Sequence, residues 1–288
     1  MPTFADRLAE AVRAKGPLCV GLDPRWESLP KAIREKFAQL PPPMNAEAAY
    51  DQFCKKVLQL VAPYTGVVKP QSAFFEQVGP CGPQGLASLL NRAKEMGFVT
   101  ILDAKRGDIA STAEAYAHAA FHGYRADSLT INPYLGRDAV EPFLSAAKKA
   151  ERGTFVLVRT SNPGAGLFQN LVCDGKPLYR HVADEVVKWN ASTIGTCGLG
   201  DVGAVVGATN PRELVELRAA MPDVWMLVPG YGAQGGTAAD VKAAYRADGL
   251  GAIVNSSRGV TFPFHPDDPD WEAKIVEAAK KAQAELRA

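Results

Sequence analysis

The chain reads FVTILDAKRGDI over residues 98–109, an apolar run that ends in a cluster of charges. In a strand, alternate side chains share a face, so Asp103 and Lys105 are expected to point the same way. Gly107 permits a tight turn, and Asp108 stands where the N-cap of a following helix is expected. The stretch predicts a strand whose carboxyl end carries one ammonium group between two carboxylates.

Those two carboxylates favour the charged form of Lys105. An imine-forming lysine has to lose its proton, so the pattern favours a lysine that acts as an acid or as an electrostatic clamp. The alternative is a buried structural ion pair, which is the commoner meaning of an isolated Asp-x-Lys in a strand. Residues elsewhere in the chain are needed to distinguish a catalytic lysine from a structural ion pair.

The bulk composition narrows the class of protein. The chain has 288 residues, is 47% hydrophobic and carries a formal charge of +1, which fits one large α/β barrel or two ordinary domains. The near-neutral charge gives no electrostatic case for binding nucleic acid or an anionic membrane. No apolar run approaches the roughly 18 residues that span a bilayer. The amino terminus lacks a signal-peptide layout, and the five scattered cysteines suggest reduced thiols, so we expect a cytoplasmic protein.

Short β-branched runs alternate with helical patterns along the whole chain, as in a parallel sheet. The expected strands are 18–22, 66–69, 98–102, 128–131, 154–158, 202–206, 224–228 and 252–254. The expected helices are 45–61, 83–96, 109–122, 137–150, 178–190, 211–220, 238–246 and 271–287. Eight such units predict an α/β fold in which residues 1–288 form a single (β/α)₈ (TIM) barrel domain. The surplus segments near 24–44 and 162–177 are expected to be loop insertions.

In this fold the active site lies at the carboxyl ends of the strands. Asp23 follows the first expected strand, Lys69 ends the second, and Asp103 and Lys105 follow the third. Polar residues at several strand ends favour an active site over an isolated ion pair.

The loops after the last two strands, residues 229–236 and 255–259, are rich in glycine and suit a phosphate. Barrels of this kind commonly bind phosphate there through backbone N–H groups. Arg258 adds a planar fork of donors. The alternative is that the glycines only serve turns and that Arg258 makes a surface salt bridge, but the two loops together favour phosphate.

The run DAKRGDI at residues 103–109 resembles the Asp-x-Lys-x-x-Asp signature of the orotidine 5′-phosphate decarboxylase family. The loop Pro-Gly-x-Gly-Ala-Gln-Gly-Gly and the turn Ser-Arg-Gly are similar to that family in order and spacing. The longer bacterial branch is the closer match, through residues 69–76 and 160–164. The resemblance extends from Asp23 to Arg258.

This resemblance implies that the protein decarboxylates orotidine 5′-phosphate to uridine 5′-phosphate and CO₂, the last step of de novo UMP biosynthesis, without cofactor or metal. Lys105 would deliver a proton to C6 of the pyrimidine, and Asp103 would lie against the substrate carboxylate. Asp108 and Thr112 would reach into the active site of the neighbouring subunit of a homodimer.

The resemblance also implies a set of substrate-binding residues. They are Asp23 and Lys69 for the ribose, Ser161 for the pyrimidine edge, and Gln234, Arg258 and the backbone near Ser257 for the phosphate. The loop contacts transfer less directly than the strand-end residues, because shorter members of the family lack the two insertions.

Two other functions fit part of the pattern. Phosphate-binding barrels of the keto-gulonate-phosphate decarboxylase or hexulose-phosphate synthase kind share the motif and use Mg²⁺, for which Asp103 would be a ligand. The Gln234 loop and the long-branch motifs count against them. A catalytically inactive barrel that binds nucleotides as a regulator is the second alternative, and the intact acid–lysine–acid set counts against it.

Overall fold

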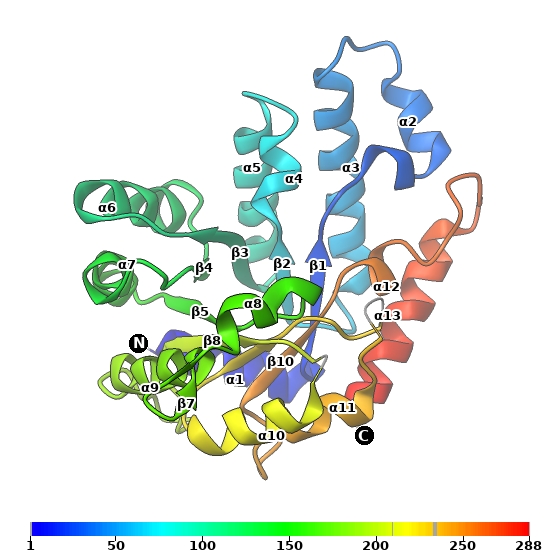
Figure 1. The fold of residues 1–288 in the computed structure, drawn as a ribbon. Coiled ribbons are helices and arrows are strands. Elements are labelled where there is room, and N and C mark those ends of the chain that lie inside the picture. Colours follow the sequence, from blue (N-terminus) through cyan, green and yellow to red (C-terminus); the bar gives the residue numbers. More distant parts are fainter. Residues whose placement is uncertain (1, 209, 233–234, 288) are drawn as a thin grey trace.

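The β-branched runs form the strands of a closed parallel barrel (Figure 1). The computed structural model describes residues 2–208, 210–232 and 235–287. The barrel strands are β1 (Leu18–Leu22), β2 (Val67–Pro70), β3 (Val99–Arg106), β4 (Ser128–Ile131), β5 (Gly153–Arg159), β8 (Val202–Val206), β9 (Met226–Val228) and β10 (Ala252–Ser256). Each strand pairs with the next along the chain, and β10 pairs with β1 to close the ring. The predicted (β/α)₈ barrel is confirmed.

Helices surround the strands, as Figure 1 shows. The longer ones are α1 (Phe4–Lys15), α3 (Met44–Val61), α5 (Gly82–Glu95), α6 (Ala110–His118), α7 (Arg137–Lys149), α9 (Leu178–Asn190), α10 (Pro211–Ala220) and α13 (Trp271–Arg287). Shorter ones are α4 (Ser72–Glu76), α11 (Ala238–Val241) and α12 (Arg258–Thr261), with a π-helical turn at Ala119–Gly123 and a 3₁₀ turn at Lys242–Ala244. None of the helices in the described part of the chain is long and apolar enough to cross a membrane.

The two surplus segments contain short helices as well as loops. The first holds a 3₁₀ turn, Trp26–Ser28, and α2 (Lys31–Phe37). The second holds a 3₁₀ turn, Pro163–Ala165, then α8 (Gly166–Gln169) and a small antiparallel hairpin. The strands of that hairpin are β6 (Val172–Cys173) and β7 (Lys176–Pro177). Both segments follow the carboxyl end of a barrel strand, which is the end that carries the expected site.

The amino-terminal helix α1 was not expected from the sequence. The Thr3 hydroxyl accepts a hydrogen bond from the N–H of Asp6, and the Asp6 carboxylate accepts one from the N–H of Thr3, which together form a capping box. Phe4 and Leu8 belong to the apolar cluster of the barrel interior, where the Phe4 ring lies edge-on to Phe155. The helix therefore closes the amino-terminal end of the barrel, below the strands in Figure 1.

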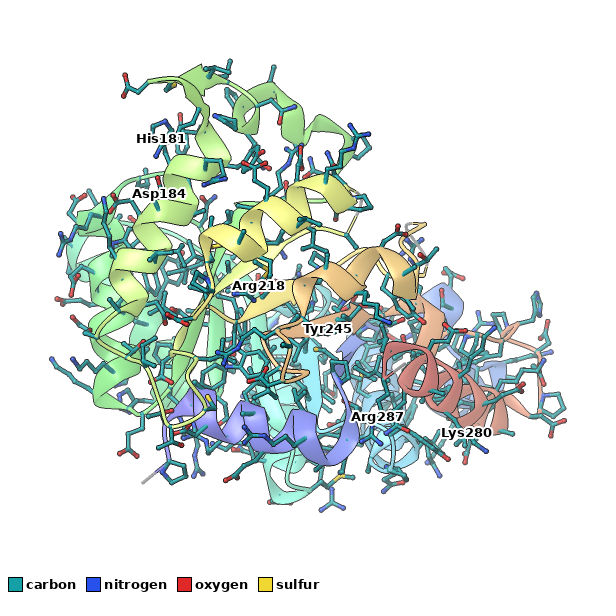
Figure 2. The ribbon with its side chains drawn as sticks, turned by 90° about the horizontal axis from the view of Figure 1, so that it is seen from below. His181, Asp184, Arg218, Tyr245, Lys280 and Arg287 are labelled. Atoms are coloured by element: carbon teal, nitrogen blue, oxygen red, sulfur yellow. The ribbon has the colours of Figure 1, made fainter. Side chains whose placement is uncertain are left out.

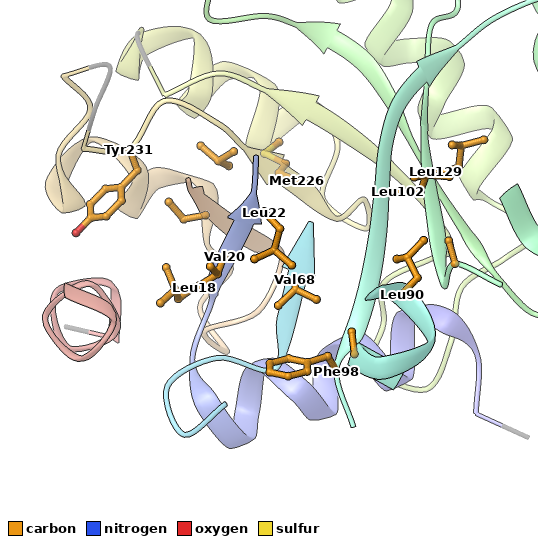
Figure 3. Packing of buried hydrophobic residues seen from close by; sticks show 14 of the residues in the cluster. Leu18, Val20, Leu22, Val68, Leu90, Phe98, Leu102, Leu129, Met226 and Tyr231 are labelled. Atoms are coloured by element: carbon orange, nitrogen blue, oxygen red, sulfur yellow. The ribbon is translucent and has the colours of Figure 1, made fainter. Parts of the chain in front are cut away.

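Side chains alternate between the two faces of each strand and form two apolar clusters. Leu18, Val20 and Leu22 of β1 belong to the outer cluster, between the strands and the helices (Figure 3). Cys19, between them, belongs to the inner cluster that fills the barrel. Because side chains alternate with a period of two, the position of a residue along a strand determines whether it faces the barrel interior or the helices.

Arg218 of α10 forms hydrogen bonds to the backbone at the amino-terminal ends of two strands. It is labelled in Figure 2, which shows the molecule from below. Its guanidinium donates to the carbonyls of Val224 (3.0 Å), Gly251 (3.1 Å), Ala244 (3.3 Å) and Met221. Val224 and Gly251 lie just before β9 and β10, whose far ends lead to the predicted phosphate loops. This buried cation acts in the scaffold, away from the strand ends that carry the site.

Candidate active site

A cavity of about 510 Å³ lies at the carboxyl ends of the barrel strands. Most of the site residues expected from the sequence line it, namely Asp23, Lys69, Asp103, Lys105, Ser161, Ser257 and Arg258. They come from widely separated parts of the chain, and the closure of the barrel brings them together.

The alternation along the strands explains why these side chains reach the cavity. Val99 and Ile101 of β3 fill the barrel interior, so Asp103, two residues further on, also faces inward. On β2, Val67 fills the interior and Lys69 follows it in the same way. Each strand thus places an apolar side chain in the barrel and a polar one at its mouth.

Asp103 is the centre of the polar cluster, and only 6% of it is exposed. Its Oδ2 lies 2.5 Å from Nζ of Lys69, and its Oδ1 lies 2.6 Å from Nζ of Lys105. The Thr130 hydroxyl donates a further hydrogen bond to Oδ1, at 2.9 Å. Both carboxylate oxygens are therefore engaged by donors before any ligand is bound.

The charges of this cluster keep one another ionised. Burial by itself would raise the pKa of Asp103, but Lys69 and Lys105 outweigh that effect and hold the pKa well below its usual range. Burial would likewise lower the pKa of Lys69, but Asp103 and then Asp23 raise it above its ordinary value. The site thus holds the Asp103 carboxylate between two ammonium groups, with Asp23 as a second negative charge nearby.

Lys105 differs from Lys69 in both backbone and exposure. Its side chain is 45% exposed, against 6% for Lys69. Its φ of 48° lies in the left-handed region, which lysine rarely adopts. Asp103 and Lys105 therefore meet as expected, but regular strand alternation is the wrong explanation, because β3 bulges between Leu102 and Arg106. Both lysines line the cavity, and the ammonium group of Lys105 is the more exposed of the two to a ligand there.

The predicted phosphate end of the cavity is formed by the turn after β10. Arg258 lines the cavity, is exposed, and has no carboxylate of the described chain within ion-pair distance. The Ser257 hydroxyl packs against β1, where a Cβ on Gly21 would lie 1.9 Å from it, so glycine is required there. Arg258 is thus a cation available to an anionic ligand. Gln234, which we also expected here, lies outside the described residues.

Two buried acceptors in the cavity have no partner within the described residues, Oδ1 of Asp23 and Oδ1 of Asn255. Buried polar atoms are normally hydrogen-bonded. These oxygens can therefore accept hydrogen bonds from the hydroxyl or N–H groups of a ligand.

Asp108 and Thr112 do not line the cavity of their own chain. Oδ1 of Asp108 accepts a hydrogen bond from the N–H of Ile109 at 2.8 Å, and Thr112 is exposed on the first turn of α6. The expectation that Asp108 caps this helix is wrong. Ile109 occupies the N-cap position, without a side-chain hydrogen bond.

Two polar lining residues, Arg25 and Thr130, were not expected from the sequence, whereas Asn255 begins the expected loop 255–259. Asn255 stands two residues after Ile253, which fills the barrel interior. Arg25 had no such signal. It lies in the first insertion, where its guanidinium stacks 5.1 Å from the ring centroid of Phe74.

The donor set around Asp103 does not suit a divalent cation. Within the described ranges, no group of three or more His, Cys, Asp or Glu side chains is arranged to hold a metal ion. The ammonium groups of Lys69 and Lys105, one on each oxygen of Asp103, would repel Mg²⁺ at this position. The carboxylate is better suited to hold the two lysines than to bind a metal.

Comparison with known proteins agrees with this geometry. A sequence profile of the orotidine 5′-phosphate decarboxylase / HUMPS family matches residues 16–267. The orotidine 5′-phosphate decarboxylase of Rhodopirellula baltica is 45% identical over 302 aligned positions that cover 100% of both chains, and that of Roseiflexus castenholzii is 42% identical, covering 96% of this chain and 93% of the relative. The structure of Leishmania donovani OMP decarboxylase, 34% identical, superposes with a TM-score of 0.78 over 99% of both chains. The chain therefore belongs to the orotidine 5′-phosphate decarboxylase / HUMPS family.

Proposed function

We propose that this chain, as one barrel domain, decarboxylates orotidine 5′-phosphate (OMP) to uridine 5′-phosphate (UMP) and CO₂, the last step of de novo UMP biosynthesis. The observation that carries the proposal is the cluster of Lys69, Asp103 and Lys105 at the mouth of the barrel. The relatives that match over their full length bear the name of this activity.

Lys105 is assigned the chemical step. Loss of CO₂ from C6 of the pyrimidine leaves negative charge on that carbon, with no cofactor to accept it. An ammonium group fixed beside the carbon stabilises the charge as it develops and then supplies the proton. Of the two lysines in the cluster, Lys105 has the exposed side chain, whereas Lys69 is nearly buried.

Asp103 is assigned a smaller part of the rate acceleration, through repulsion of the substrate carboxylate. A bare carboxylate about 4 Å from the substrate carboxylate would repel it by about 4 kcal/mol at an effective dielectric constant near 20. That is about three powers of ten in rate, while enzymes supply about 8–23 kcal/mol. Two ammonium groups and the Thr130 hydroxyl already offset the charge of Asp103, so the repulsion is weaker still. Stabilisation of the carbanion by Lys105 must carry the larger share.

The other assignments concern binding. The proposed contacts are Asp23 and Lys69 to the ribose, Ser161 to the pyrimidine edge, and Gln234, Arg258 and the backbone near Ser257 to the phosphate. The unpaired oxygen of Asp23 supports the ribose contact, and the unpaired Arg258 supports the phosphate contact. Because the phosphate is remote from C6, its binding energy would position the reacting carbon against the lysine.

The active enzyme is proposed to be a homodimer with shared sites. Asp108 and Thr112 lie outside the cavity of their own chain, so a second subunit would have to receive them. Two large apolar side chains are exposed close by in the fold: Ile109, next to Asp108 in the chain, is 55% exposed, and Tyr134, in the loop after the neighbouring strand β4, is 81% exposed. The cysteines at 19, 54, 81, 173 and 197 are free, which supports the cytoplasmic location that belongs to the same proposal.

Incubation of the purified protein with OMP, followed by chromatographic separation of OMP from UMP, tests this function. We expect conversion at the same rate in buffer and in excess EDTA. Absence of conversion would overturn the proposal. Loss of activity in EDTA with recovery on addition of Mg²⁺ would instead favour Mg²⁺-dependent chemistry of the keto-gulonate-phosphate decarboxylase or hexulose-phosphate synthase kind.

A further inference from the structure

The hydroxyl of Thr130, on β4, has each of its hydrogen-bonding positions occupied. Its oxygen accepts from the N–H groups of Ala104 (3.0 Å) and Lys105 (2.9 Å), and its proton is donated to Oδ1 of Asp103 (2.9 Å). A hydroxyl has one proton to donate and two lone pairs to accept with. Thr130 is only 1% exposed, so these bonds are made away from solvent.

All three bonds go to the bulge of β3. There β3 advances from Leu102 to Arg106 while β4 advances only from Leu129 to Ile131, so the bulged residues have no regular partners across the ladder. Backbone N–H groups that are buried without partners are costly. The side chain of Thr130 takes the place of the missing ladder bonds.

The same bonds hold Lys105 in its unusual backbone conformation. A positive φ at a residue other than glycine persists only where the surroundings fix it. At Lys105, with φ of 48°, the anchor of the N–H group is the Thr130 hydroxyl. Without that anchor the backbone is free to relax towards a regular strand, and the contact between Lys105 and Asp103 is then no longer fixed.

The hydroxyl also sets the rotation of the carboxylate. Oδ1 of Asp103 accepts from both Thr130 and Lys105, while Oδ2 accepts from Lys69. With Thr130 holding Oδ1, each oxygen faces a different lysine. The two ammonium groups are therefore kept apart on opposite sides of one carboxylate.

We propose that Thr130 is a positioning residue for decarboxylation, which holds Lys105 and Asp103 in their reactive arrangement through its hydroxyl. This inference rests on the function proposed above. Thr130 itself transfers no proton to the substrate; it acts through the two residues that do the chemistry.

The test compares the hydroxyl with the methyl group of the same side chain. Thr130→Val keeps the shape and removes the hydroxyl, and Thr130→Ser keeps the hydroxyl and removes the methyl. Thr154→Val is the matched control, because Thr154 is also 1% exposed on the neighbouring strand β5 and its hydroxyl has no partner in the described chain. For each variant, kcat and KM for OMP and the Kd for UMP are measured.

We expect Thr130→Val to lower kcat about 100-fold, the size of effect that a misplacement of about 1 Å produces, with KM and the Kd for UMP within about threefold of the wild type. Thr130→Ser and Thr154→Val should keep kcat within about threefold of the wild type, since neither removes a hydrogen bond to the bulge. Unchanged UMP binding shows that the valine variant is folded and that the defect lies in the chemical step.

Two results would overturn the inference while the wild-type chain is active. The first is the same kcat in Thr130→Val as in Thr154→Val. The second is a kcat in Thr130→Ser as low as in Thr130→Val, which would assign the effect to packing of the methyl group. If valine prevents folding, Thr130→Ala removes the hydroxyl without branching, and full kcat in that variant would overturn the inference equally. A wild-type chain that does not convert OMP would instead overturn the proposed function.

Discussion

Lys69 and Asp103 lie on the neighbouring strands β2 and β3 and form a nearly buried ion pair, with Nζ 2.5 Å from Oδ2. Burial of either charge alone would be costly, so each depends on the other. Lys105 contacts the opposite oxygen of the same carboxylate and is half exposed. One lysine therefore serves to keep the carboxylate charged and in place, which leaves the other free to act on the substrate.

Removal of the exposed lysine should abolish most of the activity. We expect Lys105→Ala to lower kcat by about 10⁴-fold or more, because proton donation contributes about 10²–10⁴ and electrostatic stabilisation about 10²–10³. The Kd for UMP should change by less than about tenfold, or 1.4 kcal/mol, since UMP needs no proton. Steady-state kinetics and calorimetric titration with UMP check this prediction. A variant with the turnover of the native chain would remove Lys105 from the mechanism.

Removal of the buried lysine should affect folding as well. Lys69→Met leaves Asp103 buried with one ammonium group fewer, and breaking a buried pair costs about 3–5 kcal/mol. We expect a loss near the lower end, about 3 kcal/mol, since Lys105 and Thr130 still contact the carboxylate. Urea unfolding measures this, with Lys188→Met as control because Lys188 pairs with Glu185 at an exposed position.

The control variant Lys188→Met should change the free energy of unfolding by no more than about 0.5 kcal/mol, as is usual for exposed ion pairs. Equal losses in the two variants would show that the ion pair of Lys69 does not stabilise the fold.

The pH dependence of stability follows from the directions of the two pKa shifts. The pKa of Asp103 is lowered on folding, so its contribution is present above the unfolded value of about 3.9 and is lost as the pH falls further. The pKa of Lys69 is raised, so its contribution is present below the unfolded value of about 10.4 and is lost at higher pH. The pair should therefore stabilise the fold evenly between about pH 5 and 9.

Urea unfolding of the wild type and of the double variant Lys69→Met/Asp103→Asn at several pH values measures this. Relative to the double variant, the wild type should lose stability below about pH 4. A difference between the two proteins that stays constant down to pH 3 would contradict the shift assigned to Asp103.

The barrel could be predicted from the sequence because its signals are local. Strands β1, β4 and β8 begin and end at the expected residues, since each is a short, mostly apolar run with Gly, Pro, Asp or Asn on both sides, a pattern typical of a buried strand. The helix at Phe4–Lys15 was missed although Thr3 and Asp6 form a capping box, because no strand precedes it to suggest a βα unit.

The bulge at the site could not be predicted in the same way. The conformation of Lys105 depends on a hydrogen bond to Thr130, which lies on another strand. No pattern within residues 98–109 contains that information. Alternation correctly placed Asp103 at the mouth of the barrel, but Lys105 reaches the same cavity through the bulge. Asp108 was expected to cap a helix because aspartate favours that position, but the helix begins one residue later.

The arrangement of Asp108 and Lys105 gives the sharpest test of a shared site. If a site takes Lys105 from one subunit and Asp108 from its partner, a mixed dimer of Lys105→Ala and Asp108→Ala chains has one intact site and one site with both substitutions. After equal amounts of the two inactive variants are unfolded and refolded together, random pairing should restore about one quarter of the wild-type activity.

Mixing Lys105→Ala with Asp103→Ala is the matched control. Asp103 and Lys105 contact each other within one chain, so every site of that mixed dimer lacks one of them and no activity should return. Differently tagged chains allow the mixed dimers to be isolated and assayed with OMP. Activity in the first mixture and none in the second requires Asp108 to act across the subunit boundary. Inactivity of verified mixed dimers of the first kind would place Asp108 outside a shared site, and its position beyond the cavity of its own chain would then exclude it from catalysis.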